Sequence, residues 1–139
     1  MPQPIKENVI FTDLSGRFTG TSTVSASPSA ATETIIGTVN IPSFGDIAIV
    51  SGVRLDGWAA FTVGTSGVSA NLRLRQTNVS GTVVAATGAC TVVAGNLYML
   101  NVLGIDATPG VGTYVLTLTI GSGAATSTVS ALHVSATVI

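Results

Sequence analysis

The chain is poor in charge. Of its 139 residues only 8% are charged, against roughly a quarter in ordinary globular proteins. Hydrophobic residues make up 46% and the mean hydropathy is +0.63. The net charge is −1, and the basic residues are scattered as Lys6, Arg17, Arg54, Arg73 and Arg75. This spacing gives no basic footprint for a nucleic acid, so nucleic acid is not expected as a partner.

Residues that carry chemistry are also scarce. The chain has one histidine, one cysteine and six carboxylates, and no Ser-His-Asp order or Cys-His pairing brings a base to a nucleophile. Cys90 cannot form an intramolecular disulfide, and we interpret it as a small buried hydrophobe. Asp46, Asp56 and Asp106 fall in separate turns without the spacing of a calcium loop. The sequence therefore predicts a non-enzymatic protein without a metal or other cofactor.

Long hydrophobic runs are missing as well. No window reaches the roughly 18 apolar residues that a membrane-spanning helix needs, so no membrane association is expected. The opening stretch MPQPIKENVIFTDLSGRF lacks the basic start, apolar middle and small-residue cleavage site of a signal peptide. We expect synthesis in a host cytoplasm without export, with any exterior position reached by assembly and lysis.

What charge there is gathers near the beginning. Lys6, Glu7, Asp13 and Arg17 place four of the eleven charged residues within the first 17 positions. Pro2 and Pro4 favour extended backbone there and remove donors. We interpret residues 1–17 as an arm that orders on contact with something else, the alternative being a frayed terminus. Residues 18–139 form the second unit, a single β domain.

From residue 18 onward the pattern is that of strands. Val, Ile, Thr, Leu and aromatic residues come in short runs between Gly, Pro, Asn, Asp and Ser, and no helical periodicity survives for ten residues. Short strands at this spacing indicate an all-β sandwich or barrel. The predicted strands cover residues 18–25, 33–41, 46–51, 53–63, 68–76, 81–86, 90–93, 97–103, 112–120 and 126–138.

Several strands have two weakly polar faces. In NLRLRQ the leucines Leu72 and Leu74 alternate with Arg73 and Arg75, as in a half-exposed strand. In TYVLTLTI, by contrast, large apolar residues alternate with valine and threonine, and VSALHVSATVI behaves similarly. A monomeric sandwich needs only one apolar face per sheet, so the second face predicts an obligate oligomer.

The order of these segments resembles a known class of domain. The chain runs from GTVNIPSFGDIAIVSGVRLDGWAAFTVG through LRLRQTNVSGTVV and TVVAGNLYMLNVLGIDATPGVGTYVLTLTI to ATSTVSALHVSATVI. Over roughly residues 30–139 it resembles the small jelly-roll domains of bacteriophage virions, which are similar to C1q and tumour-necrosis-factor-like trimers. The resemblance implies an antiparallel jelly-roll sandwich of about 8–10 strands that forms a homotrimer, with the last strand near the threefold axis. The expected subunit interface consists of Tyr114, Val115, Leu116, Thr117, Leu118, Thr119, Leu132, His133, Val134 and Val138.

The resemblance leaves three roles open, all of them non-enzymatic. The first is a capsid decoration, cement or spike protein on the capsid exterior, bound to a phage major capsid protein or another virion protein. Its docking residues would be those of the arm: Pro4, Lys6, Glu7, Ile10, Phe11, Asp13 and Arg17. The second is a fibre tip that binds a glycan or receptor through Asp56 and Trp58. The third is a small jelly-roll capsid subunit. Three copies of His133 around a trimer axis could also bind a metal or an anion, although packing is the expected role of that side chain.

Overall fold

The computed structural model describes residues 17–19, 21–22, 31–41, 52–109, 112–124 and 126–139. Every regular element among them is a β-strand, and none of them forms a helix that is long and apolar enough to cross a membrane. The strands are β1 (Arg17–Thr19), β2 (Thr21–Ser22), β3 (Glu33–Asn40), β4 (Val53–Val63), β5 (Ser69–Gln76), β6 (Val83–Ala86), β7 (Cys90–Thr91), β8 (Leu97–Asp106), β9 (Thr113–Ile120) and β10 (Ser127–Val138).

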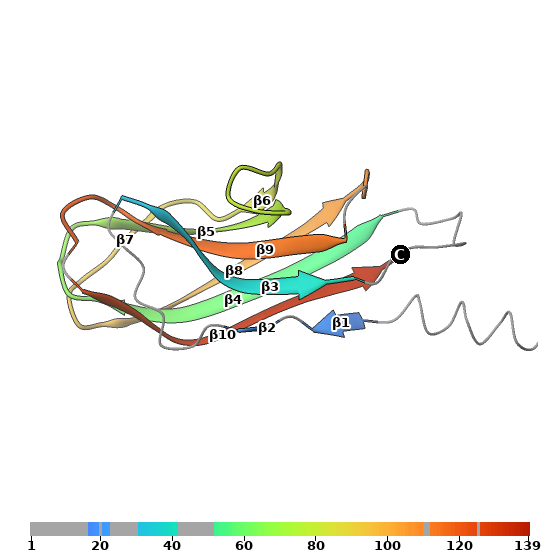
Figure 1. Ribbon diagram of the computed structural model, residues 1–139. Helices are drawn as coiled ribbons and strands as arrows, with labels where there is room; N and C mark the ends of the chain where they lie inside the picture. The colour runs from blue at the N-terminus through green and yellow to red at the C-terminus, as the bar shows by residue number, and fades with distance from the viewer. Residues whose placement is uncertain (1–16, 20, 23–30, 42–51, 110–111, 125) are drawn as a thin grey trace, which may run out of the picture.

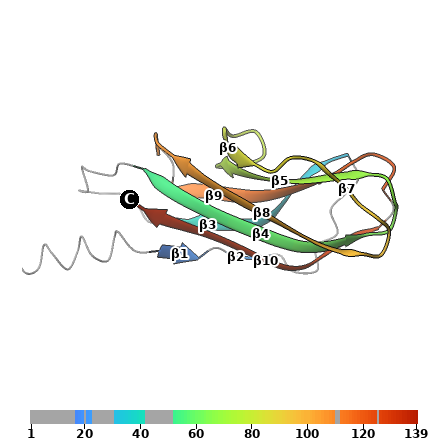
Figure 2. The same cartoon turned by 180° about the vertical axis from the view of Figure 1, so that it is seen from behind.

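The strands form two antiparallel sheets. One has the order β1-β10-β4-β8, and the other has the order β2-β3-β9-β5-β6 with β7 also paired to β5. Strands far apart in the sequence pair in a nested way: β1 with β10, β3 with β9, β4 with β8, and β5 with β6. Such nesting is that of a long hairpin rolled into two facing layers, which is the jelly-roll arrangement. The prediction of an antiparallel jelly-roll sandwich is confirmed (Figures 1 and 2).

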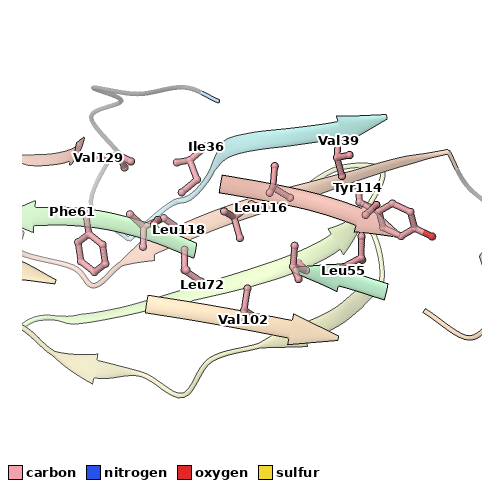
Figure 3. Close-up of a cluster of buried hydrophobic side chains, with 14 of the residues drawn as sticks. Ile36, Val39, Leu55, Phe61, Leu72, Val102, Tyr114, Leu116, Leu118 and Val129 are labelled. Carbon is pink, nitrogen blue, oxygen red and sulfur yellow. The ribbon is translucent and has the colours of Figure 1, made fainter. Parts of the chain in front are cut away.

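The core lies between the two sheets and follows the period of two along each strand. In β4 the inward residues include Leu55, Ala59 and Phe61, and in β9 they include Leu116 and Leu118, all fully buried. Figure 3 shows Leu55, Phe61, Leu116 and Leu118 in the layer between the two sheets. Aliphatic residues dominate the cluster, so burial of apolar surface holds the two sheets together.

Most predicted strands match the observed ones, and two differ. The prediction of 53–63 matches β4, while the strand predicted to end at residue 103 continues to Asp106. The single strand predicted over 18–25 is wrong, because β1 pairs with β10 in one sheet and β2 pairs with β3 in the other. The chain crosses between layers there, which no local pattern encodes. The strand predicted over 46–51 lies outside the described residues.

A close approach at Gly104 sets the spacing between β8 and β6. A Cβ atom placed on Gly104 would lie only 2.6 Å from the Cβ of Ala85 in β6. Any side chain at this position would therefore force the two strands apart. The glycine lets β6 pack against the inner side of β8 while the outer side of β8 remains uncovered by any described strand.

Candidate interaction surface

The outer face of the four-stranded sheet carries a row of exposed apolar side chains on strand β8. Alternation directs Tyr98, Leu100 and Val102 toward the core, so the odd-numbered residues point outward. The large outward side chains keep most of their surface exposed: 65% for Leu97, 59% for Met99, 62% for Leu103 and 59% for Ile105. We call these four residues the β8 stripe.

The rest of this face continues the stripe with few charges. In the register of the sheet, Asn101 of β8 lies beside Trp58 of β4, which lies beside His133 of β10. The rings of Trp58 and His133 are stacked, with centroids 6.5 Å apart and an interplanar angle of 22°. Along β4, β8 and β10, the carboxylates and guanidinium groups that point outward from this face belong to Arg54 and Asp56 near one end. The face is therefore a mostly uncharged platform around a central aromatic pair.

Burial of the β8 stripe against a partner would contribute a sizeable hydrophobic free energy of binding. Fully burying a leucine, isoleucine or methionine side chain is worth about 1.5–3 kcal/mol, so the exposed part of each stripe residue represents about 1–2 kcal/mol. A partner covering all four would gain on the order of 5 kcal/mol from this chain alone. An exposed apolar row on a long edge strand is typical of a surface that binds another protein chain.

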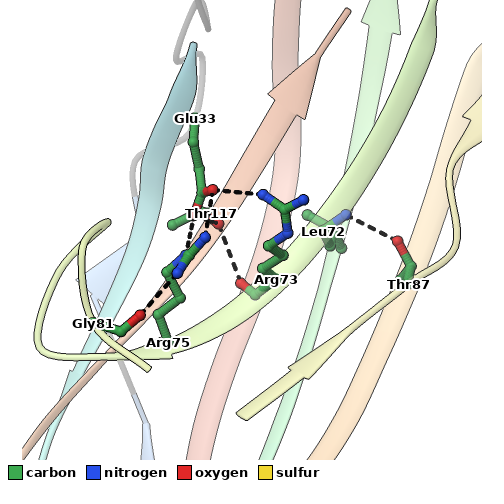
Figure 4. Close-up of polar contacts among 7 residues, drawn as sticks. All are labelled: Glu33, Leu72, Arg73, Arg75, Gly81, Thr87 and Thr117. Atoms are coloured by element: carbon green, nitrogen blue, oxygen red, sulfur yellow. Dashed lines mark hydrogen bonds and ion pairs between the residues drawn. The ribbon is translucent and has the colours of Figure 1, made fainter. Parts of the chain in front are cut away.

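The outer face of the other sheet is built differently, around the carboxylate of Glu33 in β3 (Figure 4). Arg73 donates from Nη1 to Oε1 of Glu33 at 2.7 Å, and Arg75 donates from Nη2 to the same oxygen at 3.0 Å. Arg75 also donates from Nε to the second carboxylate oxygen, and from Nη1 to the carbonyl of Gly81 at 2.8 Å. Thr117 of β9 donates its hydroxyl to Oε2 of Glu33 at 2.8 Å. This cluster ties β3, β9 and β5 together across the face.

The environment of Glu33 favours its charged form. Burial by itself opposes ionisation of the carboxyl, but hydrogen bonds from Arg75, Thr117 and Arg73 outweigh that effect and lower its pKa below 4.5. The Glu33 and Arg75 side chains are only 15% and 16% exposed. The charges of this face are thus engaged with one another and contribute a fixed structural cluster rather than an open binding site.

The same cluster explains the threonine-rich face of β9. Val115 and Thr117 are buried within the single chain. Figure 4 shows Glu33 of β3 and Arg73 and Arg75 of β5 gathered around Thr117. Thr117 satisfies its hydroxyl through Glu33. The buried hydroxyl of Thr119 has no hydrogen-bond partner among the described residues. This face of β9 is therefore already covered inside one protomer.

A second polar cluster lies at one end of the sandwich around Asp106. Its carboxylate accepts hydrogen bonds from the hydroxyl of Tyr114 at 2.8 Å and from the amide of Gln76 at 2.7 Å, and from the backbone N–H of Thr108 at 3.1 Å. Burial and the hydrogen bond to Asp106 both raise the pKa of Tyr114 well above its usual range. The cluster links the ends of β8, β9 and β5.

The predicted interface residues fall into two groups in the single chain. Tyr114, Leu116, Leu118, Val134 and Val138 belong to the core between the sheets, and Leu132 packs against it. With Val115 and Thr117 also buried, these side chains offer little free surface to a second subunit, apart from the partly buried Leu132. His133 points to the outer face beside Trp58, and Thr119 is partly buried. Among the predicted set, His133 is the residue best placed for a contact between copies.

The remaining predictions concern the docking residues of the arm, the candidate glycan contacts and Cys90. Of the predicted docking residues, Arg17 begins β1 opposite Thr137 of β10, so the sheet already starts at the expected end of the arm. Pro4, Lys6, Glu7, Ile10, Phe11 and Asp13 lie outside the described residues. Asp56 and Trp58, the candidate glycan contacts, stand two residues apart on the outer side of β4. Cys90, expected to be buried, is half-buried in β7.

The β8 stripe is the feature that sequence reasoning missed. In LYMLNVLGID both alternating sets are apolar, so the sequence does not say which one faces the core. Methionine, leucine and isoleucine on the odd positions were the available signal. No cluster of three or more His, Cys, Asp or Glu side chains suited to a metal ion occurs in the described part of the chain.

Comparison with known proteins rests on structure, since neither a protein-family model nor a curated protein sequence matches the chain. Among solved structures, the fold is similar to that of a mutant VP2 protein of infectious bursal disease virus in T=1 particles, with a TM-score of 0.59 at 11% identity. It is also similar to a chain in the structure of the T13 particle of that virus, with a TM-score of 0.59 at 12% identity, and to one in a structure of its Gx strain, with a TM-score of 0.58 at 13% identity. The match covers 88% of this chain and 30–32% of those chains, so the chain spans about a third of the length of the proteins that it resembles.

The topology and the comparison together define the class of fold. The chain is an antiparallel β-sandwich with jelly-roll strand order, and it shares this fold with part of the chains that form infectious bursal disease virus particles.

Proposed function

We propose that this protein is a non-enzymatic structural component of a virus particle, acting by contact with copies of itself and with other virion proteins. The observation that carries the proposal is a jelly-roll sandwich whose outer edge strand presents an uncharged apolar stripe. Support for a virion setting comes from the neighbouring structures, which are described as particles of infectious bursal disease virus. The clusters around Glu33 and Asp106 hold the sandwich together and leave no paired acid and base for catalysis in the described residues.

The specific form that we propose is a homotrimeric bacteriophage decoration, cement or spike protein on the capsid exterior. Residues 1–17 would attach it to a major capsid protein or another virion protein, because they hold a third of the chain's charge in a proline-bearing segment. The role of His133 near a threefold axis belongs to the same proposal, as it lies on the outer face of the last strand.

The test of docking is a binding assay with particles. Deleting residues 1–16 keeps Arg17 and all described strands, so the sandwich should still fold and keep its β-sheet signal in circular dichroism. We expect the shortened chain to remain oligomeric and to lose binding to virus particles in co-sedimentation. A shortened chain that still decorates particles would exclude the arm as the attachment.

A second candidate is a jelly-roll capsid subunit, which the described identity of the neighbouring structures favours. In that case the purified chain would close into shells by itself. Negative-stain images of the concentrated protein distinguish the two, because a decoration protein gives small separate oligomers and a capsid subunit gives particles. A glycan-binding fibre tip would use the exposed side of Trp58, and a Trp58→Ala chain would then lose host binding.

A further inference from the structure

We propose that strand β8 pairs edge to edge with β8 of a second copy of this chain, antiparallel, about a twofold axis at Asn101. Such a contact goes beyond the proposed trimer and does not depend on it. It would join the two four-stranded sheets into one continuous sheet and bring the two β8 stripes together.

The first support is that this edge is unprotected. Strand β8 pairs with β4 without a register shift over its whole length, and no described strand pairs with its other side. Natural sheets usually blunt such an edge with lysine, proline, a bulge or a short strand. From Leu97 to Ile105 the strand has no charge and no proline, and its ten residues make it long. The backbone groups on the open side of β8 are therefore available to another strand.

The second support is that β8 is complementary to itself in one register. Outward side chains meet outward ones only if the residue numbers of each pair have an even sum. Centring the twofold axis on Asn101 pairs Leu97 with Ile105 and Met99 with Leu103, and it pairs Asn101 with its own copy. Moving the centre by one residue in either direction pairs Asn101 with an apolar residue and sends an end of the stripe beyond the strand. Only the Asn101 register matches all apolar residues and lets the two amides bond to each other.

The third support is that no charge opposes the contact and that the stripe supplies part of the area that a stable interface needs. The paired strands carry no like charges that would oppose contact, and Arg54 and Asp56 stay one strand away. The stripe exposes a few hundred Å², against about 800 Å² per partner in a stable interface. The strand edge and the side chains beside it would supply the remainder. A second copy therefore fits this edge better than a charged partner does.

Disulfide trapping tests the register directly. In a Cys90→Ser background, Asn101→Cys places the two thiols directly across the axis, where paired Cα atoms lie about 4.5–5.5 Å apart and a disulfide can close. Leu97→Cys is the matched control: its side chain is exposed, but the two copies would stand roughly 27 Å apart. We expect mild oxidation to give at least tenfold more covalent dimer with Asn101→Cys than with Leu97→Cys. Equal yields, or no dimer, would overturn the proposal.

Charged substitutions within the β8 stripe provide a second test of the register. Met99 of one copy faces Leu103 of the other, so Met99→Lys/Leu103→Lys sets like charges opposite each other at two places. Met99→Glu/Leu103→Lys sets opposite charges there. Added to the Asn101→Cys chain, the first pair should reduce trapping at least tenfold and the second should restore it. Loss of trapping with both pairs, or with neither, contradicts the register. If the protein is a trimer but the Asn101→Cys chain gives no disulfide-linked dimer, the β8 contact is refuted and the proposed trimer stands. If the disulfide-linked dimer forms but no trimer is found, only the proposed trimer is refuted.

Discussion

Replacing Glu33 with glutamine should destabilise the sandwich at neutral pH. Glu33→Gln keeps the shape of the side chain but leaves Arg75, which is 16% exposed, and Arg73, which is 32% exposed, without their counter-ion. Exposed ion pairs contribute at most about 1 kcal/mol, and breaking a buried one costs about 3–5 kcal/mol. For this half-covered cluster we expect a loss of about 2 kcal/mol in the free energy of unfolding.

The effect should appear in thermal unfolding and should depend on pH. For a domain of this size, a loss of about 2 kcal/mol lowers the Tm by about 5–10 °C. Because the pKa of Glu33 is lowered in the folded state, its contribution is complete above the usual value of 4.5 and is lost as the pH falls through the folded pKa. The gap in Tm between the native chain and Glu33→Gln should therefore be widest at pH 7 and shrink below pH 4.

A matched control separates this cluster from a general effect of charge. Asp56→Asn removes a carboxylate from the outer face of the other sheet, away from the arginine cluster. We expect it to change the Tm at pH 7 by much less than Glu33→Gln does. Equal Tm values for the native chain and Glu33→Gln at pH 7, or a gap that persists unchanged at pH 3, would refute the assigned role of Glu33.

Four further substitutions test the packing. Thr117→Val removes a hydroxyl that bonds Glu33 at 2.8 Å, and it should lower the free energy of unfolding in urea by about 1–2 kcal/mol. Thr119→Val removes a buried hydroxyl that has no partner among the described residues, and it should be neutral or stabilising. A larger loss for Thr119→Val than for Thr117→Val would contradict the bonding described for β9. Tyr114→Phe removes the hydrogen bond to Asp106 and should cost about 1–2 kcal/mol in the same assay, and an unchanged midpoint would show that the bond contributes nothing. Gly104→Val should lower the Tm markedly, since its Cβ would lie 2.6 Å from the facing side chain of β6, and a native Tm would mean that β6 moves aside freely.

Much of the fold follows from local pattern. The period of two in VRLDGWAAFTV and TYVLTLTI predicts the strands and their buried faces, since only one set of large side chains can fill the core. The split of the first predicted strand into β1 and β2 could not be predicted, because a change of layer depends on which distant strands are available for pairing.

The surfaces were harder to predict than the core, for physical reasons. Glu33 lies forty residues before Arg73 in the sequence, so nothing local indicates that it covers Thr117. The dry face of β9 therefore suggested a second subunit when its cover comes from its own chain. Both faces of β8 are apolar, so its own pattern does not tell which face is exposed. That depends on the place of the strand at the edge of the four-stranded sheet. The prediction of an oligomer thus rests better on β8 than on β9.

The mass of the full chain in solution tests the central claim of a self-assembling structural protein most directly. Light scattering on purified protein from about 1 to 100 μM covers the range in which an interface of standard size is occupied. We expect a species of at least twice the 13.9 kDa chain, with a trimer as the proposed form. A single 13.9 kDa species across the whole range would contradict the account.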